Sequence, residues 1–331
     1  IDYSSMYESE IDYSTYQSKT TGFDGEGQLT SAIDYVLSDE LPVVYYVTGH
    51  NEVALPDAVK DRIEKANLEL KELNLLTAGE VPSDAAGLLL DSPETDYSKE
   101  EAQAVITYLQ NGGKTLILTD YTGKEHTNYD SILAEYGIEV TDGIVVETDS
   151  NMYVQRPYYI VPTISASEIT TDMTGGSTNV LLSGCQGFKV SENARDTLDI
   201  STVLSPSENA FVKTDPQNMT SYDKEESDAD GPFSVAVTVS EDVSGTSDED
   251  SDSSGVDEAT TETDNAATEA ATSNETKTTQ LVAIASSAIL DSSMNSMVSD
   301  GNYTLYMNAM KWLVDTGDSN RVSIASKSVA V

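Results

Sequence analysis

Apolar and polar positions in the first part of the chain follow two patterns: short continuous apolar runs, and apolar residues that recur at the spacing of an α-helix. Runs such as Val43–Val47 are typical of buried strands, whereas apolar residues three and four apart predict amphipathic helices. The pattern predicts strands over residues 43–48, 68–75, 87–91 and 115–119, and helices over residues 28–39, 56–67 and 127–136. Because strands and helices follow one another through short loops, we expect an α/β fold with a mostly parallel, Rossmann-like sheet flanked by helices.

One further helix is predicted from its end signals. Ser98 and Glu101 have the spacing of a capping box, in which the N-cap side chain and the third helical residue satisfy each other's backbone amides. Gly112 and Gly113 follow the helical pattern and are typical of a C-terminal cap. We therefore expect this helix to run from the Ser98 cap to Gln110.

The middle of the chain changes character and predicts added β-structure. Short β-like segments with little helical pattern occur at residues 138–147, 179–183, 187–190, 199–204 and 209–213. We expect them at one edge of the sheet or in a small subdomain. Strands at 233–239 and 280–286 are predicted to form a hairpin with an overlong connection, and a helix at 302–315 precedes a short strand at 322–325.

The connection within that hairpin is an acidic insert. Residues 241–276 hold 12 Asp or Glu residues and no Lys or Arg, among mostly small polar residues, so they are predicted to be disordered. The boundaries of the other predicted segments are set by where the strand and helix patterns begin and end. We expect an extended N-terminal arm over residues 1–27, one α/β domain formed by residues 28–240 and 277–325, and a C-terminal tail over residues 326–331.

Charge and composition narrow the classes of partner. The chain of 331 residues has 17 Lys and Arg against 58 Asp and Glu, a formal net charge of −41, so it repels nucleic acid and anionic lipid. A single cysteine excludes an intrachain disulfide. No apolar run is long enough to span a membrane, and no signal peptide or initiating Met is present. We expect an excised fragment whose missing part carried any membrane anchor.

The candidate site lies at the predicted carboxyl ends of three strands, where open α/β sheets bind ligands. It consists of Gly49, His50, Glu52, Asp91, Ser92 and Asp120. One histidine among carboxylates is compatible with ligand or partner binding, with acid–base catalysis or with a purely structural turn. No pair of histidines has metal-ligand spacing, so neither a metal nor another cofactor is expected.

The single cysteine raises an enzymatic alternative. Ser183-Gly184-Cys185-Gln186-Gly187 is similar to the Gly-x-Cys-x-Gly nucleophile elbow of glutamine-amidotransferase-like folds, with serine in place of the first glycine. An elbow needs a helix after the cysteine and a histidine near it, yet a β-like segment follows here. A small buried thiol is the competing interpretation.

Several stretches together resemble one family. They are residues 29–33, 44–52, 81–90, 92–101, 108–114, 120, 282–286 and 302–313. This set resembles the extracytoplasmic domain of GldG-type ABC-transporter auxiliary proteins over about residues 24–325, without the acidic insert. Two departures are mild. Asn51 replaces the second glycine of Thr-Gly-His-Gly-Glu, and Met310-Lys311 replaces Leu-Asn before Trp312.

The resemblance implies a membrane-anchored cell-surface protein beside an ABC permease and ATPase, with a glutamine-amidotransferase-like fold that lacks the catalytic residues. We therefore expect a non-enzymatic auxiliary domain that binds a partner or small ligand near His50. Two alternatives stay open. One is a hydrolase or amidotransferase-like enzyme using Cys185 or a His50-centred acid–base pair, and the other is a cell-surface structural or adhesive module.

Overall fold

A computed structural model describes residues 6–12, 17–37, 41–174, 178–243, 277–314 and 327–328. The predicted strand at 322–325, residues 244–276 of the acidic insert and most of the C-terminal tail lie outside these residues.

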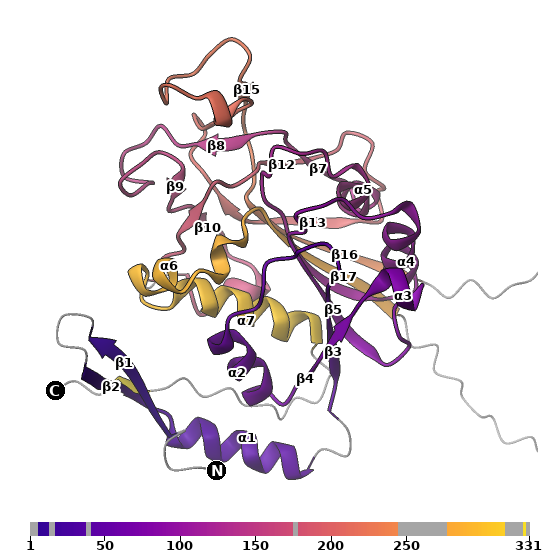
Figure 1. Ribbon diagram of the computed structural model, residues 1–331, viewed down its shortest axis with the longest axis vertical. Helices are drawn as coiled ribbons and strands as arrows, with labels where there is room; N and C mark the ends of the chain where they lie inside the picture. The colour runs from indigo at the N-terminus through magenta and orange to yellow at the C-terminus, as the bar shows by residue number, and fades with distance from the viewer. Residues whose placement is uncertain are drawn as a thin grey trace, which may run out of the picture.

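The core of the molecule is an eight-stranded sheet (Figure 1). Its strands, in spatial order, are β10 (Thr163–Ile164), β13 (Asp199–Ser205), β16 (Ala236–Val243), β17 (Lys277–Ile284), β6 (Lys114–Leu118), β5 (Ala85–Asp91), β3 (Val43–Val47) and β4 (Glu69–Leu73). β17, β6, β5, β3 and β4 are parallel, and β16, β13 and β10 add antiparallel pairs at one edge. The predicted mostly parallel sheet is confirmed.

Helices cover both faces of this sheet (Figure 1). α2 (Asp57–Lys65) and α7 (Gly301–Val314) lie on one side, and α3 (Leu75–Ala78), α4 (Lys99–Gln110) and α5 (Thr127–Glu135) lie on the other. The central strands are therefore buried on both faces, as their near-continuous apolar runs predict. The short helices α3 and α6 (Ser292–Met297) were not predicted, because each spans less than two turns.

The predicted hairpin on either side of the acidic insert is confirmed. β16 and β17 pair antiparallel in one continuous register, from Ala236 opposite Ile284 to Val243 opposite Lys277. Each strand is displaced by about three residues from its predicted limits, toward the insert. The described ends of the insert are thus held next to each other by the sheet.

The middle of the chain forms the expected β-rich addition. β7 (Ile138–Val140) pairs with β12 (Phe188–Val190), and β9 (Tyr159–Ile160) pairs with β11 (Leu182–Ser183). β8 (Ile144–Val146), β14 (Phe211–Lys213) and β15 (Ala229–Asp230) form a three-stranded sheet. The predicted edge location and the predicted subdomain therefore both occur, since β13 and β10 extend the main sheet.

The N-terminal segment is more ordered than an extended arm. β1 (Tyr7–Asp12) and β2 (Gln17–Phe23) form an antiparallel hairpin, and β18 (Lys327–Ser328) pairs with β2. α1 (Gly25–Leu37) follows, beginning three residues before its predicted start. Figure 1 shows these elements beside α2 and away from the main sheet. An ion pair between Asp24 and Lys65 joins them to α2.

Candidate functional site

The loop after β3 folds around its own glutamate. The Glu52 carboxylate accepts hydrogen bonds from the backbone amides of Gly49 and His50, each at 2.9 Å. Gly49 has φ 136°, and a Cβ there would lie 2.7 Å from Nδ2 of Asn74. Only glycine fits this backbone. The turn therefore fixes His50 at the carboxyl edge of the sheet.

The His50 ring lies between two carboxylates. Its Nδ1 is 3.5 Å from Oε1 of Glu52, and its Nε2 is 3.3 Å from Oε2 of Glu101. The ring also packs against Tyr97, with 4.7 Å between ring centroids, and the His50 side chain is only 13% exposed. Glu52 was a predicted neighbour of His50. Glu101 was predicted only as a helix cap.

Glu101 has both roles at once. The predicted capping box is confirmed, because Ser98 Oγ accepts from the Glu101 amide and the Glu101 carboxylate accepts from the Ser98 amide at 2.9 Å. The same Oε2 atom faces His50. The capping pattern indicated where the helix begins, but a contact between residues 51 positions apart has no sequence signal. That is why sequence reasoning missed Glu101 as a site residue.

Asp91, at the end of β5, completes the group that we call the His50 cluster: His50, Glu52, Asp91, Tyr97 and Glu101. Asp91 is buried, and neither of its carboxylate oxygens has a hydrogen-bond partner among the described residues. Burial, with a smaller contribution from the Glu52 charge, raises the pKa of Asp91 to about 8. Asp91 is therefore mostly protonated and uncharged at neutral pH.

Two tyrosine hydroxyls share this environment. The hydroxyls of Tyr97 and Tyr306 are buried and have no hydrogen-bond partner among the described residues. Burial, and to a lesser extent the nearby carboxylates, raise the pKa of both tyrosines well above the usual range. Buried polar groups in folded proteins are normally hydrogen-bonded. This part of the sheet edge thus has an excess of hydrogen-bonding groups.

Ser92 and Asp120 belong to a neighbouring network. The Asp120 carboxylate accepts from the amide of Ser287 at 2.9 Å and from the Ser287 hydroxyl. Burial raises the pKa of Asp120, although hydrogen bonds from Ser287 and Ser92 oppose that shift. The structure therefore brings Gly49, His50, Glu52 and Asp91 together. It places Ser92 and Asp120 in contacts that connect β5 and β6 to the segment after β17.

Cys185 lacks the surroundings of an activated nucleophile. The residue is 1% exposed, and burial together with the Asp120 charge raises the pKa of its thiol. β11 precedes it and β12 follows, where an elbow requires a helix. No hydrogen bond or ion pair joins Cys185 to His50 within the described part of the chain. The thiol is therefore protonated and has no histidine base bound to it.

Within the residues that the structure describes, no group of three or more His, Cys, Asp or Glu side chains is arranged to hold a metal ion. None of the helices in the described ranges is both long and apolar enough to cross a bilayer.

Comparison with a solved domain supports the fold. The chain is similar to the mmIFT52 N-terminal domain with a TM-score of 0.52 and 14% identity, covering 83% of this chain and 98% of that one. It is less similar to a putative ThuA-like protein from Bacteroides uniformis, with a TM-score of 0.41, 11% identity and coverage of 84% and 94%. For PurLQS from Thermotoga maritima the TM-score is 0.36, with 8% identity and coverage of 83% and 100%.

Sequence comparisons identify the family. No match was found among curated proteins. The family model for auxiliary proteins described as "ABC-type uncharacterized transport system" matches residues 41–314, which include the His50 cluster and every strand of the main sheet. This agrees with the resemblance to ABC-transporter auxiliary proteins, while the narrower GldG type stays a prediction. The chain belongs to the ABC-type uncharacterized transport system auxiliary family.

Proposed function

We propose that this chain is the extracytoplasmic binding domain of an ABC transport system and that it engages its partner or a small ligand at the sheet edge around His50. The ABC permease and ATPase subunits are the proposed protein partners. A membrane anchor outside this chain would keep the domain beside them. The family match supports the transport setting, and the His50 cluster supports the location of the binding site.

The arrangement of the His50 cluster carries this proposal. His50 lies between Glu52 and Glu101, while Asp91, Tyr97 and Tyr306 present polar atoms without hydrogen-bond partners among the described residues. Leaving such groups unpaired costs about 1–3 kcal/mol each. A protein retains that cost most readily at a functional site, so the exposed edge beside these buried atoms is the proposed binding surface.

Two exposed residues connect the His50 cluster to the protein surface, where a partner can contact them. Asn51 and Glu94 are exposed, and they are joined by a long hydrogen bond of 3.4 Å between their side chains. The Glu94 amide donates to the carbonyl of His50 at 2.9 Å. A partner that contacts Asn51 or Glu94 therefore changes the surroundings of His50 directly. Because both side chains are exposed, substituting them leaves the hydrophobic core intact.

Binding is favoured over catalysis by the roles of the carboxylates. Glu52 and Glu101 each accept backbone hydrogen bonds that hold a turn or a helix start, so both are engaged in positioning His50. Cys185 is a protonated, buried thiol. The geometry supports a preorganised recognition site, and it leaves the Cys185 thiol without the surroundings of an activated nucleophile.

The proposal is tested by co-purification from membranes that contain the anchored protein and its ABC permease and ATPase. His50→Gln and Asn51→Arg are expected to lower recovery of both subunits at least fivefold. His126→Gln and Glu208→Arg are matched controls, because the first lies in another loop and the second is exposed elsewhere. Circular dichroism melts verify folding. Equal recovery with all four variants would contradict the proposed site.

A further inference from the structure

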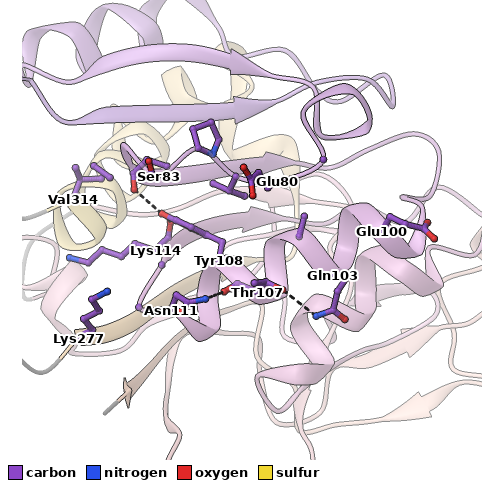
Figure 2. Close-up of a pocket in the computed structure, with 18 of the residues that line it drawn as sticks. Glu80, Ser83, Glu100, Gln103, Thr107, Tyr108, Asn111, Lys114, Lys277 and Val314 are labelled. Atoms are coloured by element: carbon purple, nitrogen blue, oxygen red, sulfur yellow. Dashed lines mark hydrogen bonds between the residues drawn. The ribbon is translucent and has the colours of Figure 1, made fainter. Parts of the chain in front are cut away.

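A recess runs along α4 from the amino edge of the sheet toward the start of the helix. It is a groove of about 1140 Å³ between α4 and the loop at residues 79–83 (Figure 2). Ala85, Lys114 and Lys277, the first residues of β5, β6 and β17, also line it. No residue of the His50 cluster is among its lining residues.

Small side chains form the floor of this groove. Ala85, Ala86 and Ala104 leave the space that larger residues would fill. The Tyr108 ring is fixed beside them, because its hydroxyl donates to the carbonyls of Ala85 and Lys114, each at 3.3 Å. Since the backbone holds the floor in place, the groove is preformed and needs little rearrangement to accept an occupant.

One wall carries a row of polar side chains along α4. Gln103, Thr107 and Asn111 are four residues apart, so they lie above one another on the same face of the helix. All three are exposed, and Figure 2 shows them along the groove. Asn111 Nδ2 donates to the Thr107 carbonyl at 2.7 Å, and Gln103 Nε2 donates to the Thr107 hydroxyl at 3.4 Å. The amide oxygens and the second N–H of each amide are left to bond to the backbone of an extended chain. The row spans about 12 Å at the rise of an α-helix, or about four residues of an extended segment.

Charged side chains lie at both ends of the groove. Figure 2 shows Lys114 and Lys277 at one end, and Glu100 lies toward the other. Lys99 also lines the groove. Glu80 lines the groove too, and Lys99 is next to Glu100 at the start of α4. In a chain with a net charge of −41, the basic site is therefore the end formed by Lys114 and Lys277. Such a site attracts carboxylates by charge complementarity, and the attraction weakens with salt.

We propose that this groove binds an extended acidic segment of a partner protein. The carboxylates would lie at Lys114 and Lys277, and the backbone of the segment would follow the row from Gln103 to Asn111. The small floor admits an extended backbone, and the polar row offers it hydrogen bonds. The lysine end sets the preference for acidic sequence. This assignment is independent of the proposal for His50.

Fluorescence anisotropy with a labelled eight-residue peptide of alternating Asp and Ser tests this inference on the whole chain. Saturable binding that weakens with salt is expected, at least tenfold tighter than for an Asn–Ser peptide. Lys114→Glu with Lys277→Glu should weaken binding at least tenfold. Lys124→Glu with Lys224→Glu, two lysines elsewhere on the surface, is the matched control and should change it less than twofold.

A second variant separates shape from charge. Ala104→Trp fills the floor without altering any charge, and Ala104 is only half-buried, so α4 tolerates the change. It should weaken peptide binding at least tenfold. Binding that Ala104→Trp leaves unchanged, or no saturable binding, would overturn the inference.

Residues 244–276 carry ten acidic side chains and directly precede, in sequence, Lys277, which lines the groove. Binding seen only after a short Gly–Ser linker replaces them would assign the groove to this chain's own segment instead.

Discussion

At the scale of single residues, the three carboxylates at the carboxyl edge of the sheet differ in the hydrogen bonds that they receive. Glu52 and Glu101 are stabilised by backbone amides and face His50. Asp91 has no such donors, and burial raises its pKa to about 8. Asp91 therefore differs from the two glutamates in the hydrogen bonds that it receives, and burial without such bonds accounts for its raised pKa.

Asp91 makes the stability of the protein depend on pH. An unfolded aspartate has a pKa of about 3.9, so between that value and about 8 the folded state holds a proton that the unfolded state has released. The free energy of unfolding must fall as pH rises through this window. Asp120 and Asp130, whose pKa values burial also raises, add to the slope in this window. Asp91→Asn should remove the part of the slope that Asp91 contributes, and its advantage over the wild type should be largest above pH 8, by a few kcal/mol. Urea denaturation at pH 5 and pH 9 measures both effects. The same slope in variant and wild type would refute this account of Asp91.

At the scale of elements, the start of α4 supports the site as well as the helix. Ser98 and Glu101 cap each other, and the capped turn holds the Glu101 carboxylate next to His50. Sequence patterns predicted this cap, the main-sheet strands other than β10 and the β16–β17 hairpin, because local spacing determines each of them. They did not predict Glu101 as a neighbour of His50, or the groove beside α4, because both depend on how distant elements pack.

Ser98→Ala tests the element that links cap and site. Loss of the N-cap side chain should destabilise the protein by about 1 kcal/mol, and it removes one of the donors that hold the Glu101 carboxylate. Ser98→Thr should restore most of this stability, since threonine keeps a hydroxyl that can cap the helix and donate to the Glu101 carboxylate. Chemical denaturation at pH 7 provides the measurement, with Ser83→Ala at an exposed loop position as control. A Ser98→Ala variant as stable as that control would mean that the cap contributes little.

At the scale of the whole molecule, we propose two separate recognition regions on one α/β unit. The His50 cluster lies at the carboxyl edge of the parallel strands, and the groove runs along α4 from the amino edge of β5, β6 and β17. The location of the first region was predictable, because ligands of open α/β sheets bind at the carboxyl edge. The second region depends on alanines at three positions, and an alanine in a sequence does not indicate that a groove lies beside it.

The acidic insert should be dispensable for this architecture. Val243 and Lys277 lie opposite each other in the β16–β17 register, so a four-residue Gly–Ser turn can replace residues 244–276. Shortening the connection lowers the entropy cost of closing it, and we expect a gain in stability of about 1–2 kcal/mol. Thermal and urea unfolding of the shortened chain measures this. A large loss of stability would show that the insert is part of the folded domain.

The central claim is that the edge around His50 binds a component of an ABC transport system. Its most direct measurement is the affinity of the purified chain for the detergent-solubilised permease–ATPase complex, determined by biolayer interferometry for the wild type, Asn51→Arg and Glu208→Arg. We predict saturable binding that Asn51→Arg weakens at least tenfold and Glu208→Arg leaves within twofold. Absence of binding, or equal affinities for all three proteins, would contradict the claim.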